Sequence, residues 1–131
     1  MATSDNVVRA GLTPKFKDVE TLLSMLTYES GAPGAKRVLP TTRGRYTTCF
    51  TPPGINEFQV LFTQVPADAA ETELAPLNGP ALVLVVAGQG TLNASVPIKK
   101  GWTGFVSAHE PLAFQAKDAP LQVYTAFCER T

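Results

Sequence analysis

The chain is poor in the residues from which metal sites and disulfide frameworks are built. Its 131 residues contain one histidine, His109, and two cysteines, Cys49 and Cys128. A catalytic zinc or iron site needs a cluster of histidine and carboxylate ligands, which one imidazole does not supply. We therefore expect no metal site within this chain and interpret His109, which precedes Glu110, as a turn residue. The alternative, a metal ligand at a turn between two strands, stays open.

The two cysteines are also too few and too far apart for a disulfide framework or a zinc-binding spacing. Both lie in apolar, strand-like segments, so we predict reduced core residues in a cytoplasmic protein. The longest apolar run, residues 81–87, is far shorter than the roughly 20 residues that cross a bilayer. We also recognise no signal peptide before the polar start, and we expect neither a membrane span nor secretion.

An excess of charge of one sign is missing as well. Eleven basic side chains balance eleven acidic ones, which gives a formal net charge of zero. Nothing in this balance indicates a nucleic acid or an anionic membrane as partner. With 44% hydrophobic residues, the chain is long enough for one core that buries roughly two thirds of the surface of the unfolded chain.

From residue 46 onward the sequence is rich in short strand patterns bounded by turn residues. We predict strands at residues 46–50, 57–65, 71–75, 81–87, 91–96, 102–106, 112–116 and 121–128. The continuously apolar segment 81–87 indicates a buried central strand, and we interpret Gly88-Gln89-Gly90 as the hairpin turn after it. Strands that recur about every eight to twelve residues predict a mostly β, jelly-roll sandwich or barrel.

The N-terminal part predicts a different local structure. Val7-Val8 favours a strand, Gly11 permits a sharp turn, and Thr13-Pro14 is typical of a helix start with Thr13 as the N-cap. The apolar residues that follow recur at helical spacing and form one face: Phe16, Val19, Leu22, Leu23 and Leu26. We therefore expect a strand, a turn and one amphipathic helix, with Lys15 in the first helical turn.

One stretch resembles a known family: Ser4-Asp5-Asn6-Val7-Val8-Arg9-Ala10-Gly11-Leu12-Thr13-Pro14-Lys15. It is similar to a signature near the sugar-binding cleft of the type I mannose-6-phosphate isomerases (phosphomannose isomerases) of the cupin superfamily. The likeness continues through residues 16–22, and the whole match covers the C-terminal third of that family. It implies a cupin-like jelly-roll domain over residues 38–131, preceded by residues 1–37 as a remnant of the isomerase cleft region.

The resemblance also implies a chemistry. Members of that family are zinc-dependent aldose-ketose isomerases that interconvert mannose 6-phosphate and fructose 6-phosphate. It implies that Arg9 lies over the reacting carbons and that Asp5 and Lys15 serve sugar handling and ring opening. Cationic side chains suit a sugar phosphate and its enediol intermediate, and a carboxylate can carry the ring-opening proton. The family's zinc ligands come from the preceding part of its chain, so we expect no cofactor here.

A plain structural interpretation of these residues stays open, in which Asp5 and Arg9 pair with each other or with a neighbouring domain. Three hypotheses follow. The chain is the C-terminal portion of an isomerase that is inactive alone, or a stand-alone carbohydrate-binding, lectin-like module. The third is an interaction domain that self-associates or docks its helix onto a partner carrying the missing half.

Overall fold

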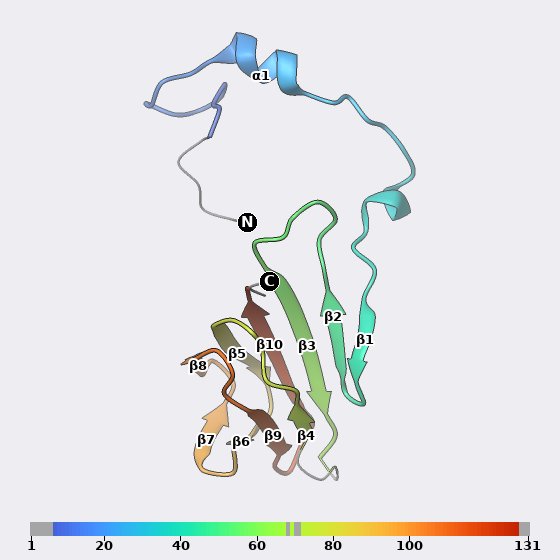
Figure 1. Ribbon diagram of the computed structural model, residues 1–131, viewed down its shortest axis with the longest axis vertical. Helices are drawn as coiled ribbons and strands as arrows, with labels where there is room; N and C mark the ends of the chain where they lie inside the picture. Colours follow the sequence, from blue (N-terminus) through green and yellow to red (C-terminus); the bar gives the residue numbers. More distant parts are fainter. Residues whose placement is uncertain (1–6, 68, 70–71, 129–131) are drawn as a thin grey trace. The chain divides into compact units, whose positions relative to one another are not determined.

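The computed structural model describes residues 7–67, 69 and 72–128 (Figure 1). Its contacts divide the chain into two units, Met1–Arg37 and Val38–Thr131, which are described separately below. Within the described residues, no helix is long and apolar enough to cross a membrane.

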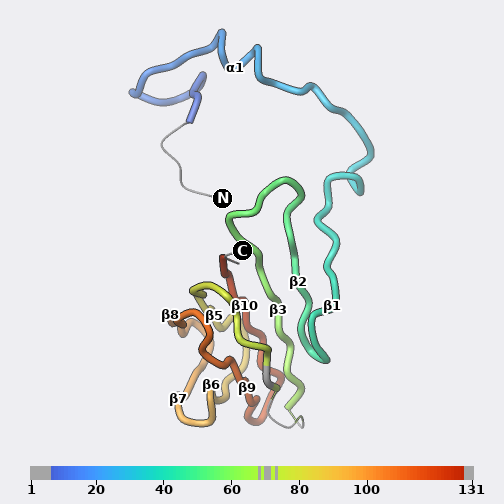
Figure 2. Tube along the Cα trace, viewed as in Figure 1, coloured from blue at the N-terminus to red at the C-terminus, as the bar shows by residue number. Residues whose placement is uncertain are grey.

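The second unit is a two-sheet β-sandwich. Its ten strands in the described residues are β1 (Thr41–Gly44), β2 (Thr47–Phe50), β3 (Gln59–Val65), β4 (Thr72–Leu74), β5 (Ala81–Ala87), β6 (Gln89–Leu92), β7 (Val96–Lys99), β8 (Thr103–Val106), β9 (Leu112–Ala116) and β10 (Leu121–Phe127). The larger sheet has the order β1-β2-β3-β10-β5-β8, and the smaller one β4-β9-β6-β7. Every pair is antiparallel, and the trace shows β3 and β10 running side by side (Figure 2). The expected mostly β sandwich is confirmed.

The core lies between the two sheets. Successive side chains of a β-strand point to opposite faces of the sheet. In β3, β5, β9 and β10, buried side chains accordingly alternate with more exposed ones. β5 differs from the expectation that it is buried throughout. Val83 and Val85 are buried, whereas Leu82 and Leu84 are exposed on the other side of the sheet. An apolar run is thus compatible with a strand that is covered on one face only.

The prediction of a hairpin turn at Gly88-Gln89-Gly90 is wrong. Gly88 has a φ of 79° and links β5 to β6, but Gln89 and Gly90 already belong to β6. The reversal between β6 and β7 falls at residues 93–95, where Asn93 and Ala94 have φ values of 50° and 56°. Asn93 suits this conformation, and its amide joins the turn to the start of β9: Oδ1 accepts from the N–H of Ala113 at 2.8 Å.

Residues 7–37 of the N-terminal unit contain one helix, α1 (Val19–Met25), and one 3-10 turn, η1 (Pro33–Lys36). The helix start expected at Thr13-Pro14 is wrong, because Asp18 is the N-cap. Lys15 consequently lies before the helix. The strand expected at Val7-Val8 is absent from the described residues, since positions 7–10 have no regular structure.

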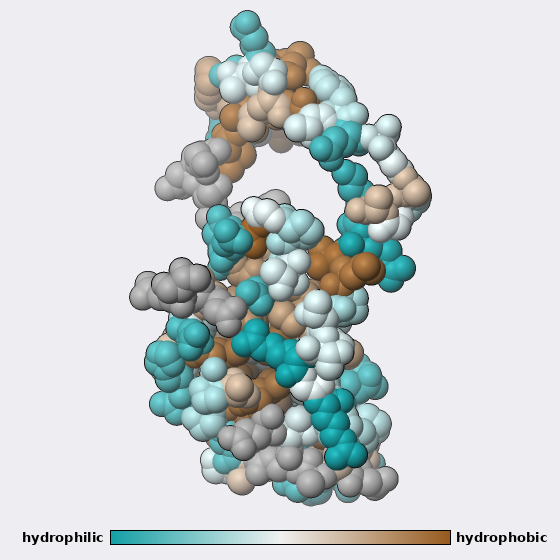
Figure 3. Space-filling model, turned by 45° about the vertical axis from the view of Figure 1, so that its right-hand side comes forward, coloured by the Kyte–Doolittle hydropathy of each residue, from teal (hydrophilic) through white to brown (hydrophobic). Residues whose placement is uncertain are grey.

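The apolar face expected for the helix is not covered within its own unit. No residue of α1 is buried. The large apolar side chains left exposed around it are Leu12, Phe16, Val19, Leu23, Met25, Leu26 and Tyr28. The space-filling view shows such brown side chains on the surface of the N-terminal unit (Figure 3). Helix formation here rests on local capping, because little packing supports it.

Candidate functional site

Arg9 and Lys15 lie on one closed loop that leads into α1. The backbone N–H of Asp18 donates to the carbonyl oxygen of Arg9 at 2.8 Å and joins the two ends of segment 9–18. Inside the loop, the N–H of Lys15 donates to Oγ1 of Thr13 at 3.2 Å, a local turn of the kind that threonine favours. Thr13 therefore orders the loop that carries Lys15, although the sequence predicted it as a helix cap.

The two cationic side chains have few partners in the protein. Arg9 is half-buried as a residue, and its Nη1 donates to the carbonyl oxygen of Val7 at 3.4 Å, a long and exposed contact. Lys15 is exposed. In the part of the chain that the structure describes, the ion pair found joins Lys36 to Glu29, and neither Arg9 nor Lys15 has a carboxylate partner. Among the described residues, no acidic group therefore competes with an anionic ligand for these two cations. Asp5, the third candidate, lies outside the described residues.

Asp18, which closes the loop, has a structural task. Its Oδ1 accepts from the N–H of Thr21 at 3.0 Å, and its Oδ2 accepts from the hydroxyl of Thr21 at 2.8 Å. These hydrogen bonds, the backbone one first, lower the pKa of Asp18 below its ordinary value of 3.8, and slight desolvation opposes them. The carboxylate is therefore ionised near neutral pH, and both of its oxygens accept hydrogen bonds at the helix N-terminus. A carboxylate in this state is poorly suited to accept and release protons.

His109 occupies a turn between β8 and β9, as expected. Its φ is 67°, and its backbone N–H donates to the carbonyl oxygen of Leu77 at 2.8 Å. Among residues 7–67, 69 and 72–128, no three histidine, cysteine, aspartate or glutamate residues come together where they could hold a metal ion. These residues do not fit the zinc that the resemblance implies, and we assign no chemical step to a metal held by them. Cys49 is buried, Cys128 is half-buried, and both are free thiols.

Sequence patterns did not indicate a hollow beside Trp102. Its volume is about 460 Å³, and its lining includes Trp102, Lys99, Lys117, Gln89 and Thr91. The indole ring packs so closely over Gly104 that a Cβ at that position would collide with it. The hydroxyl of Thr91 is buried and has no hydrogen-bond partner among the described residues. A flat aromatic ring with ammonium and amide groups around it is suited to a polar ring such as a saccharide. Its only sign in the sequence is a tryptophan after the Lys99-Lys100-Gly101 turn.

The family model and the curated relatives that match this chain are both of phosphomannose isomerases, also called mannose-6-phosphate isomerases. The family described as phosphomannose isomerase type I C-terminal matches residues 50–97. Mannose-6-phosphate isomerases of Schizosaccharomyces pombe, Cryptococcus neoformans and Homo sapiens are 39%, 42% and 35% identical, each over 98% of this chain. The alignments cover 33%, 30% and 32% of these relatives. The chain thus spans about a third of the length of the curated relatives that it matches.

Solved structures share the fold. A mannose 6-phosphate isomerase from Salmonella typhimurium, described as bound to substrate (f6p) and zinc, superposes with a TM-score of 0.77 at 24% identity. The apo form of that enzyme gives the same TM-score and identity, and both alignments cover 99% of this chain and 32% of the other. The cupin-like sandwich of this chain therefore has the same fold as the aligned part of those enzymes. The chain corresponds in sequence and in fold to the C-terminal region of the type I phosphomannose isomerases.

Proposed function

We propose that this chain supplies the C-terminal part of a mannose-6-phosphate isomerase and that Arg9 and Lys15 bind the anionic sugar phosphate. The observation that carries the proposal is the closed loop of residues 9–18. It holds two cationic side chains that have no carboxylate partner in the described part of the chain. The relatives that carry the name of this activity are 35% to 42% identical over nearly the whole chain.

The chemistry of an aldose-ketose isomerisation suits these two side chains. A proton moves between adjacent carbons through an enediol, and negative charge develops on the neighbouring oxygen. The planar guanidinium group of Arg9 can donate two hydrogen bonds to that oxygen and its neighbour, whereas the ammonium group of Lys15 offers a point charge to a phosphate. Asp5 keeps the ring-opening role that the family resemblance implies.

This chain would form only part of the enzyme. A solved isomerase with this fold is described as holding zinc, whereas the described residues here do not fit a zinc site. We therefore assign the metal to the part of the relatives that precedes the aligned third. It follows that the chain alone is inactive and acts after it docks onto such a part.

An isomerase assay on mannose 6-phosphate with added zinc tests this proposal. The chain is assayed alone and after co-expression with the preceding two thirds of the Schizosaccharomyces pombe relative. We expect turnover only from the combination. In that combination, Arg9→Ala lowers kcat/KM about 100-fold or more, because a donor aimed at developing charge is lost. Lys15→Ala mainly raises KM, since a phosphate contact is lost in both ground and transition states.

Lys17→Ala is the matched control, because Lys17 is an exposed lysine of the same unit to which we assign no role. It leaves kcat/KM unchanged. Turnover by the chain alone contradicts the assignment of the metal to another part. Equal activity of the Arg9→Ala and Lys17→Ala combinations contradicts the role of Arg9.

The hollow beside Trp102 favours a second candidate function, a saccharide-binding module. Trp102 is the only tryptophan of the chain, so the fluorescence of the protein reports directly on this hollow. Stacking of a sugar ring on the indole changes the intensity or wavelength of emission during a titration with mannose or mannose 6-phosphate. An unchanged spectrum at millimolar sugar rules out this candidate.

A further inference from the structure

Two rows of residues on the outer face of the larger sheet are uncharged and mostly apolar across five neighbouring strands. The pairing registers align two rows of residues across β2, β3, β10, β5 and β8 on this face. One row consists of Thr48, Phe62, Tyr124, Leu84 and Thr103, and the other of Phe50, Val60, Ala126, Leu82 and Phe105. None of these ten residues carries a charge at neutral pH. We call these two rows the outer face.

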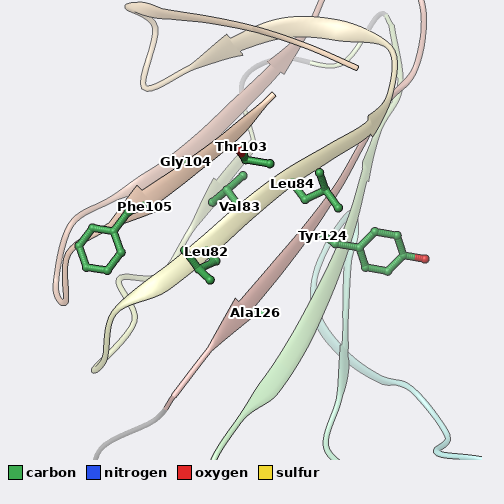
Figure 4. Close-up of a pocket in the computed structure, with 8 residues that line it drawn as sticks. All are labelled: Leu82, Val83, Leu84, Thr103, Gly104, Phe105, Tyr124 and Ala126. Atoms are coloured by element: carbon green, nitrogen blue, oxygen red, sulfur yellow. The ribbon is translucent and has the colours of Figure 1, made fainter. Parts of the chain in front are cut away.

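Four large apolar side chains of the outer face are exposed to solvent. Phe105 is 69% exposed, Leu82 62%, Leu84 41% and Tyr124 40%. Around a hollow of about 590 Å³, β5, β8 and β10 contribute these side chains, as the close-up shows (Figure 4). The core-facing neighbours, such as Val83, are buried. The larger sheet of this sandwich therefore has two apolar faces, and the smaller sheet covers only one of them.

Exposed apolar side chains gathered on one face are a candidate interaction surface. Five strands spaced about 4.8 Å apart span roughly 19 Å. Soluble monomers rarely expose a contiguous apolar area of more than a few hundred Å², and larger areas mark interaction sites. Phe62 and Tyr124 form a ring pair with centroids 4.8 Å apart, which provides a preformed aromatic centre of the kind found at the energetic centre of interfaces.

The chemistry of the outer face limits what can cover it. Without a charged side chain, its two rows offer nothing to the phosphate of a substrate, so an apolar protein surface is the complement. This chain matches about a third of the polypeptide of its relatives. In those relatives, the other two thirds are covalently attached to the matching part. An attached partner has an effective concentration of about millimolar, whereas a second copy of the chain associates only at its own concentration.

We infer that the outer face docks against an apolar surface of the preceding two thirds of the isomerase, and that it is the main contact between this sandwich and that part. The inference rests on the proposed function and names the surface that the docking uses. It is separate from the loop of Arg9 and Lys15, which serves the substrate.

Copurification tests the inference without an activity assay. The chain is co-expressed with the tagged preceding two thirds of the Schizosaccharomyces pombe relative, so that each part can fold against the other, and the affinity of the purified parts is measured by titration calorimetry. Leu84→Lys places a charge in the outer face. Val96→Lys is the matched control, because Val96 is 39% exposed on a strand of the smaller sheet. We expect Leu84→Lys to weaken binding about tenfold or more, since a buried unpaired charge is costly, and Val96→Lys to bind like the unchanged chain.

Phe105→Lys is a second variant, on the edge strand β8, where a lysine disturbs folding least. Circular dichroism and urea unfolding show which variants are folded. Equal affinities for the two face variants and the control overturn the inference, and so does failure of the unchanged chain to copurify. A chain that dimerises through the outer face, with Leu84→Lys monomeric yet still able to bind the other part, overturns it in favour of a second copy. Failure of the proposed function gives a different result, namely intact binding without turnover.

Discussion

At Gly90, the backbone of a neighbouring strand occupies the space that a side chain would need. A Cβ there would collide with the carbonyl oxygen of Gln115. The cause is the position of β6 between β7 and β9, where Gly90 is paired with Ile98 on one side and Ala116 on the other. Glycine is therefore required by close approach of strands, and its φ is not positive.

Gly90→Ala lowers the free energy of unfolding by about 1–3 kcal/mol, because the strands must move apart to admit the methyl group. Urea denaturation measures the change. Gly34→Ala is the control, since no atom lies within 4 Å of a Cβ built at Gly34. It changes the free energy of unfolding by less than about 0.5 kcal/mol. Equal stability of the two variants would show that β6 adjusts freely.

Asp18 makes the helix at the front of the chain dependent on pH. Because hydrogen bonds lower the pKa of its carboxyl group in the folded state, the ionised form favours the capped helix. This contribution is fully present above about pH 3.8, the ordinary value, and is lost as the pH falls through the lower folded pKa. Carbon chemical shifts of residues 19–25, recorded by NMR between pH 6 and about pH 2, should lose helical character in the acid range.

Two variants separate the cap from the charge. Asp18→Ala removes the acceptor and lowers the helical shifts at every pH. Asp18→Asn keeps an acceptor oxygen without a titrating group, so the shifts stay helical and no longer respond to acid. A flat pH profile for the unchanged chain would contradict the role of the carboxylate.

At the scale of elements, the strands of the larger sheet are joined by threonines as well as by the apolar core. Thr47 on β2 and Thr63 on β3 are both buried, and their hydroxyl oxygens lie 2.9 Å apart in a shared hydrogen bond. Thr125 on β10 is equally buried, but its hydroxyl has no partner among the described residues. Thr63 and Thr125 are thus buried in the same sheet, but only the hydroxyl group of Thr63 has a hydrogen-bond partner among the described residues.

This difference predicts opposite responses to the same substitution. Thr63→Val leaves the hydroxyl of Thr47 buried without a partner and lowers the free energy of unfolding by about 1–3 kcal/mol. Thr125→Val removes an unsatisfied group at nearly constant volume, so stability is unchanged or rises by up to about 1 kcal/mol. Thermal and urea unfolding compare the two variants. A loss in Thr125→Val as large as in Thr63→Val would mean that a buried water satisfies Thr125.

At the scale of the whole molecule, the hydrophobic core belongs to one unit. Among the described residues, the buried core residues fall between Cys49 and Phe127, within the second unit, whereas α1 in the first unit has no buried residue. We therefore propose Val38–Thr131 as a domain with its own core, and Met1–Arg37 as a separate unit.

A chain that begins at Val38 should fold alone. Its urea transition is expected to be cooperative, with a free energy of unfolding within about 1 kcal/mol of that of the full chain, because the core residues found in the described part of the chain lie in the second unit. Hydrogen exchange of the full chain supports this if the amides of α1 exchange much faster than those of β10. Loss of the cooperative transition on truncation would contradict the boundary.

Prediction from the sequence succeeded where a local pattern decided the outcome. Residues 112–116 were predicted and found as a strand because a short, mostly apolar segment bounded by turn residues is visible in a few neighbouring residues. β1 (Thr41–Gly44) was missed, since its first three residues are polar and exposed and only pairing with β2 makes the segment a strand. The helix start was misplaced because Thr13 and Asp18 are both good caps, and the bond from Asp18 to Arg9 closes a loop that excludes the earlier start.

The sequence by itself determined the β-sandwich class, the single helix and the likeness that singles out Arg9 and Lys15, since residue type and spacing alone carry this information. Only the tertiary structure decided that Leu82 and Leu84 of an all-apolar strand face outward, and that Trp102 borders a hollow with two lysines. The physical reason is that burial depends on which strands and sheets come to lie against a residue. Those neighbours are distant in the chain, so no local pattern specifies them.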